Sequence, residues 1–331
     1  MNAMYGAAGA GALSSAFALP GVDLAKSVDP AGYIPDAGLV DAVNVALMLR
    51  QPLLVTGEPG TGKTQLAFSV AWQLGLDAPV VFETKSTSVS RDLFYTFDNV
   101  RRFQASHETG ADLDPRAFVE YKALGLAILR TLDATARNRW MKRGDAEAAP
   151  ERRSVVLIDE IDKAPRDFPN DILSELENLY FRIPELGNSR IAANPGLRPI
   201  VVVTSNSEKS LPDAFLRRCI FYHIPFPDEA RLEEIVLARV PSIAAAPRSM
   251  LADVLEFFDR LRQDRPGLRK RPGTAELIGW VTALLTIGAD PSQPLRTQPE
   301  PAVRTLSAIA KHAEDQEQTT ELFRSWVHEN D

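Results

Sequence analysis

The sequence predicts an α/β fold in which a parallel sheet, covered by helices on both faces, is followed by a smaller helical region. Apolar runs without polar alternation occupy residues 80–82, 155–158 and 200–204. Such runs are typical of strands buried on both faces of a parallel sheet. Residues 52–56 predict one more strand, and helical patterns between the strands complete βαβ units. From about residue 228 onward only helical patterns remain.

These patterns predict three parts of the chain. Residues 1–36 form an arm and a linker, residues 37–227 the α/β domain, and residues 228–331 a helical domain. Two segments fit the α/β alternation poorly and predict hairpin insertions near residues 91–103 and 180–191, the second around a Gly-Asn turn signal. Two long helices are expected in the last part, at residues 274–287 and 302–327.

Composition limits the classes of function. The chain has 331 residues and a formal net charge of −7, so its surface gives no electrostatic reason to expect binding to nucleic acid or anionic membranes. The single cysteine, Cys219, permits neither an intrachain disulfide nor a Cys-rich zinc site and favours a reducing compartment. No apolar run approaches the ~20 residues of a membrane helix, and the Ala/Gly-rich start lacks the basic residues of a signal sequence. We therefore expect a cytoplasmic protein without membrane insertion.

A glycine-rich segment between the first predicted strand and the next helix matches the phosphate-loop pattern G-x-x-x-x-G-K-[ST]. Its glycines allow successive backbone N–H groups to point at one phosphate, with the positive end of the following helix aimed at the same place. Lys63 is expected to reach the β- and γ-phosphates, and the Thr64 hydroxyl to bind Mg²⁺. The predicted nucleotide-binding residues here are Gly57, Glu58, Pro59, Gly60, Thr61, Gly62, Lys63, Thr64 and Gln65.

Two adjacent carboxylates, Asp159 and Glu160, end a predicted buried strand about a hundred residues later. Alone, this pair would be read as a solvated strand end, but its position after a phosphate loop favours a catalytic reading. Asp159 is then expected to hold Mg²⁺, and Glu160 to polarise the water that attacks the γ-phosphate. The nearby Asp162 is expected to be structural or solvated.

The order of motifs resembles the AAA+ ATPases. The segments are GEPGTGKT, VVLIDEID, VVVTSN, LPDAFLRRC and, in the helical region, RKRPGTAEL. The resemblance covers about residues 30–290 and is greatest to the MoxR-like branch, which carries extra hairpins where RDLFYTFDNVRRF and YFRIPELGNSRI occur here. It implies a P-loop NTPase αβα core with a small helical lid domain, binding ATP and Mg²⁺.

Further site residues follow from this resemblance alone. Asn206 matches the first sensor, a polar side chain that hydrogen-bonds the attacking water or the γ-phosphate, although an Asn in a turn is the plain alternative. Arg218 matches the arginine finger that completes a neighbouring subunit's site, and the adjacent Arg217 could share that role. A surface salt bridge is the alternative for both arginines.

The second sensor and the adenine site are also implied by the resemblance. Arg271 takes the sensor position, with Lys270 in reserve, although the family usually shows a different local sequence and a plain basic cluster competes. Adenine is expected near Tyr33 and Ile34 by family position.

The resemblance implies an ATPase whose subunits form a homo-oligomeric ring, expected to be a hexamer, that couples ATP turnover to chaperone-like remodelling of a partner protein. A partner with a von Willebrand factor A domain is the family-level expectation, and no nucleic-acid partner is expected. An ATP-gated scaffold, in which binding drives assembly and turnover is incidental, carries the same motifs and stays open. For Phe94, Tyr95 and Phe97 two readings also stay open, a client-gripping pore loop and, more commonly, burial in a core.

Overall fold

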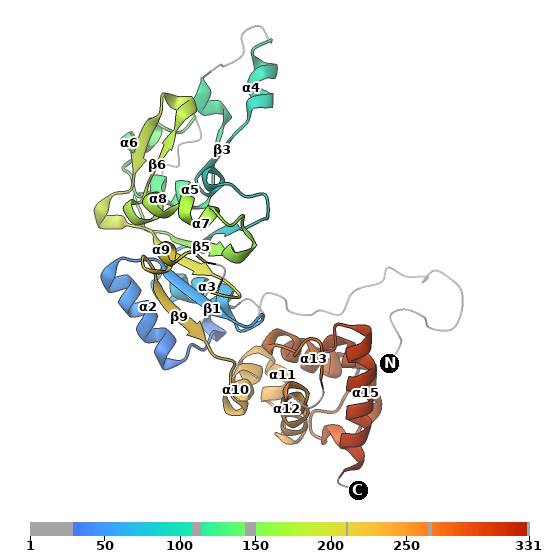
Figure 1. Ribbon diagram of the computed structural model, residues 1–331. Helices are drawn as coiled ribbons and strands as arrows, with labels where there is room; N and C mark the ends of the chain where they lie inside the picture. The colour runs from blue at the N-terminus through green and yellow to red at the C-terminus, as the bar shows by residue number, and fades with distance from the viewer. Residues whose placement is uncertain (1–28, 108–113, 143–149, 210, 264–266, 330–331) are drawn as a thin grey trace, which may run out of the picture. The chain divides into compact units, whose positions relative to one another are not determined.

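The computed structural model describes residues 29–107, 114–142, 150–209, 211–263 and 267–329. Residues 1–28 of the predicted N-terminal arm lie outside this range. The described residues form two compact units (Figure 1). The first unit comprises residues 33–225, and the second begins at residue 226 and includes residues 29–32. Each unit is described below by itself.

The first unit is built around one parallel sheet of five strands. Its order is β2-β5-β8-β1-β9, and every neighbouring pair runs in the same direction. The strands are β1 (Leu53–Gly57), β2 (Val80–Glu83), β5 (Val155–Asp159), β8 (Ile200–Thr204) and β9 (Ile220–Ile224). Sequence patterning missed β9 because this strand lies at the sheet edge, where its side chains alternate in exposure and are not uniformly apolar.

Alternate residues of the central strands enter two separate hydrophobic cores. Leu53 and Val55 of β1 pack against α2 and α3, whereas Leu54 faces the core built from the later helices. Both faces of the sheet are therefore covered, which explains why the strand sequences show continuous apolar runs. The helices of this unit are α2 (Ala37–Leu49), α3 (Lys63–Gln73), α4 (Asn99–Ala105), α5 (Ala123–Arg130), α6 (Ala134–Asn138), α7 (Phe168–Asp171), α8 (Leu173–Asn178) and α9 (Asp213–Leu216).

Two small antiparallel pairs are added to this core. β6 (Tyr180–Ile183) and β7 (Ser189–Ala192) form a hairpin in the segment for which the sequence predicts one. The segment near residues 91–103, also predicted as a hairpin, contributes only the strand β3 (Tyr95–Phe97) and then continues into α4. The partner of β3 is β4 (Val119–Tyr121), which lies beyond the predicted segment, so the two strands of this pair are not joined by a short turn.

The aromatic residues considered for a pore are buried. Phe94, Tyr95 and Phe97 expose 4%, 2% and 7% of their surface. Phe94 stacks on Phe181 of β6 with ring centroids 5.4 Å apart, and the Tyr95 hydroxyl donates to Glu185 Oε2 at 2.9 Å. These contacts join the two antiparallel pairs, so the core reading holds and the pore-loop reading of these three side chains is wrong.

Helix α5 approaches the β3 segment so closely that only glycine fits at position 125. A Cβ atom there would lie 2.0 Å from the carbonyl oxygen of Phe94. We expect Gly125→Ala to lower the free energy of unfolding by about 3 kcal/mol, because backbone atoms cannot yield as a flexible side chain would. Urea denaturation measures this change.

Gly279→Ala is the matched control for this substitution. Gly279 also lies inside a helix, but nothing lies within 4 Å of the position that its Cβ would take. The control should be neutral or stabilising by up to about 1 kcal/mol, because alanine is the better helix former. Equal effects of the two substitutions would contradict the packing argument.

The second unit is helical and has its own aromatic core. Trp280, Trp326, Phe257 and Phe323 are fully buried, and the two indole N–H groups donate to Thr305 Oγ1 and Glu256 Oε1 at 3.0 and 2.9 Å. The helices are α10 (Glu229–Arg239), α11 (Pro241–Ala244), α12 (Ser249–Arg262), α13 (Thr274–Thr286), α14 (Pro299–Thr305) and α15 (Ala313–His328). No helix in the described part of the chain is long and apolar enough to span a bilayer.

The long helix predicted at residues 302–327 is interrupted. α14 ends at Thr305, and α15 begins only after His312, whose backbone is extended. The restart places the buried Asp315 carboxylate where it accepts the backbone N–H groups of Arg269 and Lys270 at 2.8 and 3.3 Å. Periodicity could not detect this break, because apolar residues continue at helical spacing on both sides of it.

Candidate functional site

The phosphate-loop segment connects β1 to α3, as the sequence predicts. Gly60 and Gly62 have φ values of 84° and 86°, in the left-handed region that favours glycine. Thr61 closes the turn by donating its backbone N–H and its hydroxyl to the carbonyl oxygen of Glu58 at 3.3 and 2.8 Å. The loop therefore curls back on itself directly before the N-terminus of α3, which is the geometry that directs backbone N–H groups at an anion.

Lys63 lies inside this loop and is 7% exposed. Its Nζ donates to the carbonyl oxygens of Gly57 and Glu58 at 2.8 and 2.9 Å. Burial lowers the pKa of Lys63 from its ordinary value, and the negative charges of Asp162, Asp159 and nearby glutamates oppose that shift. The side chain thus places a cationic donor within the loop.

The end of β5 brings Asp159 to Thr64, the second residue of α3. The Thr64 hydroxyl donates to Asp159 Oδ1 and Oδ2 at 3.0 and 3.1 Å. One hydroxyl and one carboxylate are the oxygen ligands that Mg²⁺ takes from proteins when phosphates and water complete its shell. The donor set therefore fits the expected metal. Within the described residues, no cluster of three or more His, Cys, Asp or Glu forms a separate metal site.

Thr204 at the end of β8 is a site residue that sequence reasoning missed. Its buried hydroxyl donates to Asp159 Oδ1 at 2.6 Å and accepts the backbone N–H of Glu160 at 2.8 Å. A polar residue at the end of the apolar run VVVT was the available signal, because parallel strands end at the same edge of the sheet. Thr204 therefore fixes both acidic residues at once.

Glu160 departs from regular strand geometry. Its φ and ψ are 54° and 51°, a left-handed conformation that is uncommon for a non-glycine residue and often found at functional sites. The Glu160 carboxylate is 40% exposed and pairs with Lys163. That hydrogen bond raises the pKa of Lys163 above its ordinary value. The carboxylate is therefore accessible to solvent.

Asn206 lies two residues beyond the end of β8, beside Asp162. Its backbone N–H donates to Asp162 Oδ1 and its Nδ2 to Asp162 Oδ2, both at 3.2 Å. Asp162, expected to be structural or solvated, thus holds the side-chain amide of Asn206 in one orientation. The close sequence spacing of Asp159 and Asp162 was a signal that could have linked Asp162 to the site.

Arg217 and Arg218 follow α9 and are both exposed. The Arg218 Nε donates to Glu177 Oε2 at 3.0 Å and its Nη1 to the carbonyl oxygen of Ala214 at 2.9 Å. Both arginines therefore lie on the surface of the unit, and neither makes a contact with Lys63, Asp159 or Glu160 within the described part of the chain. Nothing in their geometry places them in the site of their own subunit.

Tyr33 contacts the loop, because a Cβ on Gly62 would lie 3.0 Å from its ring. Ile34 is half-buried beside it in sequence. In the helical unit, Arg271 is exposed just before α13, whereas the Lys270 ammonium lies 3.5 Å from Glu276 Oε1. The structure therefore brings Tyr33 to the phosphate loop and leaves Arg271 and Lys270 in the other unit.

Known proteins resemble this chain in structure and in sequence family. Two mutant forms of RuvB from Thermotoga maritima are similar in structure, with 16% and 17% sequence identity and a TM-score of 0.46 each. The first match covers 84% of this chain and 69% of that one, the second 86% and 72%. No curated protein sequence matches. Residues 53–227, more than half of the chain, match the ATPase family associated with various cellular activities. The chain therefore belongs to this family, the AAA ATPases.

Proposed function

We propose that this protein hydrolyses ATP and uses the energy to remodel a partner protein, as a MoxR-like member of the AAA+ ATPases. The observation that carries the proposal is the convergence of Lys63, Thr64, Asp159 and Glu160 at one edge of the sheet. Each has the chemistry that γ-phosphate cleavage requires, and the Thr204 hydroxyl bonds both the Asp159 carboxylate and the backbone N–H of Glu160.

In this proposal Lys63 and the loop N–H groups bind the β- and γ-phosphates. Thr64 and Asp159 hold Mg²⁺, which supplies charge neutralisation between the phosphates when it is bound. Tyr33 and Ile34 border the adenine, and the contact of the Tyr33 ring with Gly62 supports this placement. Gln65 and the remaining loop residues complete the phosphate cradle.

Glu160 accepts the proton of the attacking water. Its exposed carboxylate can exchange Lys163 for water, because a surface ion pair contributes only about 0–1 kcal/mol. Asn206, held by Asp162, donates a hydrogen bond to that water or to the γ-phosphate. Arg271, with Lys270 as the alternative, is proposed as the second sensor.

Arg218 completes the site of a neighbouring subunit in a homo-oligomeric ring, expected to be hexameric, with Arg217 able to share this role. Its exposure and its position away from the site of its own unit support a role in trans. A head-to-tail contact of this kind closes into a ring when its rotation permits.

The MoxR-like assignment draws its support from the two antiparallel pairs that the chain adds to the AAA core. A partner protein, with a von Willebrand factor A domain as the family-level expectation, is proposed as the client. The helical domain at residues 228–331 is proposed as the lid. A cytoplasmic location is proposed too, and the single cysteine, which permits no intrachain disulfide, supports it.

The test is phosphate release from ATP–Mg²⁺ across a range of protein concentrations, with native mass spectrometry of the same samples. Turnover should rise steeply with concentration, in parallel with the ring species, because each site needs two subunits. Nucleotide-dependent assembly without phosphate release would support the ATP-gated scaffold instead. Full turnover by the monomer would contradict the shared site.

The contact between Asp162 and Asn206 gives a further prediction. We expect Asp162→Ala to lower kcat about tenfold to a hundredfold with little change in KM, because Asn206 loses the partner that orients its amide. Asp162→Asn, which keeps one acceptor oxygen, should lose less. Steady-state kinetics separate kcat from KM, and thermal unfolding checks that both variants fold. A raised KM with unchanged kcat would contradict the positioning role.

A further inference from the structure

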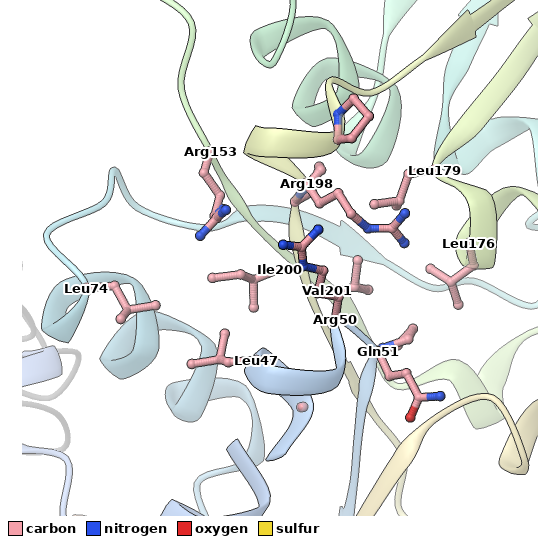
Figure 2. Close-up of a pocket in the computed structure, with 14 residues that line it drawn as sticks. Leu47, Arg50, Gln51, Leu74, Arg153, Leu176, Leu179, Arg198, Ile200 and Val201 are labelled. Carbon is pink, nitrogen blue, oxygen red and sulfur yellow. The ribbon is translucent and has the colours of Figure 1, made fainter. Parts of the chain in front are cut away.

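A cavity lies at the end of the sheet opposite the phosphate loop. It has a volume of about 290 Å³ and is bordered by the residues before β1 and β5, by the start of β8 and by the end of α2 (Figure 2). The strands between this cavity and the phosphate loop have five residues each, or roughly 17 Å of extended chain. None of the residues assigned above to nucleotide binding or hydrolysis lines it.

Three arginines face this cavity. Arg50, Arg153 and Arg198 come from three distant segments, and Figure 2 shows their guanidinium groups gathered around Ile200 and Val201. No Asp or Glu is among the lining residues. Within the described part of the chain these arginines form no salt bridge, so three positive charges share one hollow without a neutralising carboxylate.

The hydrogen bonds of these arginines leave most of their donors unused. Arg198 Nη2 donates to the carbonyl oxygen of Glu177 at 2.8 Å, and Arg153 Nη2 to that of Gly196 at 3.0 Å. Arg198 Nε is buried and has no hydrogen-bond partner. Burial and the nearby charge of Arg50 lower the pKa of Arg198. A buried, unsatisfied guanidinium N–H is a group that an anion in the cavity would satisfy.

The backbone at Arg50 is the second unusual feature. Arg50 ends α2 with φ 57° and ψ 34°, the left-handed conformation that helices normally give to glycine or asparagine. An arginine in this conformation carries backbone strain that a glycine would avoid. The guanidinium group of this strained residue, Arg50, is directed at the cavity.

Apolar side chains supply the remaining walls. Leu47 and Leu74 border the cavity on one side, and Leu176 and Leu179 on the other (Figure 2). A ligand that matches this surface has a multiply charged anionic head for the arginines and a small apolar body for the leucines. Arginine forks bind phosphate in a bidentate manner, and a phosphate monoester carries close to two negative charges.

We propose that this cavity is a binding site for a small organic phosphate monoester with an apolar body, separate from the ATP site. The phosphate contacts Arg50, Arg153 and Arg198, and the body packs against the leucines. The volume lies at the lower end of ligand pockets and suits a body of about one ring.

Phenyl phosphate is the probe, measured by isothermal titration calorimetry on the full chain with ADP–Mg²⁺ in excess to occupy the phosphate loop. One phenyl phosphate should bind per chain. Inorganic phosphate, which lacks the apolar body, and phenol, which lacks the phosphate, should each bind about tenfold more weakly or worse. No binding of phenyl phosphate, or equal binding of inorganic phosphate, would overturn the proposal.

Variants locate the probe. Arg198→Leu and Arg50→Gly should each weaken phenyl phosphate about tenfold or more, because each removes a charge-assisted donor. Arg50→Gly is the sharper variant, since glycine suits the left-handed backbone and the chain should fold without loss of stability. Arg50→Lys should retain part of the affinity. Arg304→Gln, which removes an exposed arginine outside the cavity, is the matched control and should bind like the wild type.

Two outcomes would contradict this ligand site. Unchanged phenyl phosphate affinity in Arg50→Gly and Arg198→Leu, with loss in Lys63→Ala, would place the probe in the phosphate loop. A shift in oligomer size for Arg50→Gly, seen by native mass spectrometry without probe binding to the wild type, would mean that the arginines meet carboxylates of a second copy. Either result overturns the ligand site and leaves the proposed ATP hydrolysis standing.

Discussion

Glu160→Gln is expected to bind ATP–Mg²⁺ with nearly the wild-type Kd and to release phosphate about 10²–10⁴-fold more slowly, the range that general-base catalysis contributes. The amide keeps the size and the hydrogen-bonding reach of the carboxylate but cannot accept a proton. Binding should persist, because the phosphate and Mg²⁺ contacts are proposed to come from Lys63, Thr64 and Asp159. Equilibrium binding of a fluorescent ATP analogue and single-turnover phosphate release measure the two effects separately.

The geometry around Glu160 makes this substitution interpretable. Thr204 holds the position through the backbone N–H, so the side-chain change leaves that anchor intact. Lys163→Ala is the control, because it removes the exposed partner of the carboxylate and keeps the carboxylate itself. The control should stay within a few-fold of the wild-type rate, since surface ion pairs are weak. Wild-type turnover in Glu160→Gln would remove Glu160 from the catalytic role.

Arg218→Ala is expected to lower turnover by about 10³–10⁵-fold while ATP binding is largely retained, as for an arginine finger that acts on the transition state. The side chain is exposed and pairs with Glu177 on its own surface, so its removal leaves no buried charge and should hardly alter stability. Arg304→Ala, which removes another exposed arginine in a surface ion pair, is the matched control and should hydrolyse ATP normally.

Mixing the two inactive chains tests whether Arg218 acts in trans. An interface that takes its phosphate loop from Arg218→Ala and its arginine from Glu160→Gln has both groups intact. If subunits mix at random, about a quarter of the interfaces in an equal mixture should recover activity, because the contact is head-to-tail. No recovery in rings shown by mass spectrometry to be mixed would contradict a role in trans.

Much of the geometry of the candidate site was predictable because the residues that form it are contiguous in sequence. The glycines and Lys63 occupy one loop, and Asp159 and Glu160 are adjacent at a strand end. The αβα core was predictable for a related reason. Strands covered on both faces show apolar runs, such as that of β5, which differ from the helical patterns around them.

Features that depend on the packing of distant segments were not predictable. Tyr95 of β3 pairs with Tyr121 of β4, and no turn signal marks that closure. Thr204 and Asp162 join the site only because parallel strands end at the same edge of the sheet. The arginine cavity likewise assembles from the end of α2 and from the residues before two strands. The hydropathy pattern of the sequence alone assigns such residues to loops or to solvent-exposed ends of strands and helices.

Thr204 has a consequence for how this edge of the sheet responds to movement. One buried hydroxyl ties the carboxylate of Asp159 and the main chain of Glu160 to β8, and Asn206 follows two residues later on the same strand exit. A displacement of that exit by a nucleotide or a neighbouring subunit would shift the proposed metal ligand, the proposed base and the amide together. The three groups would then become aligned or misaligned together in one movement, and none would change position independently of the others.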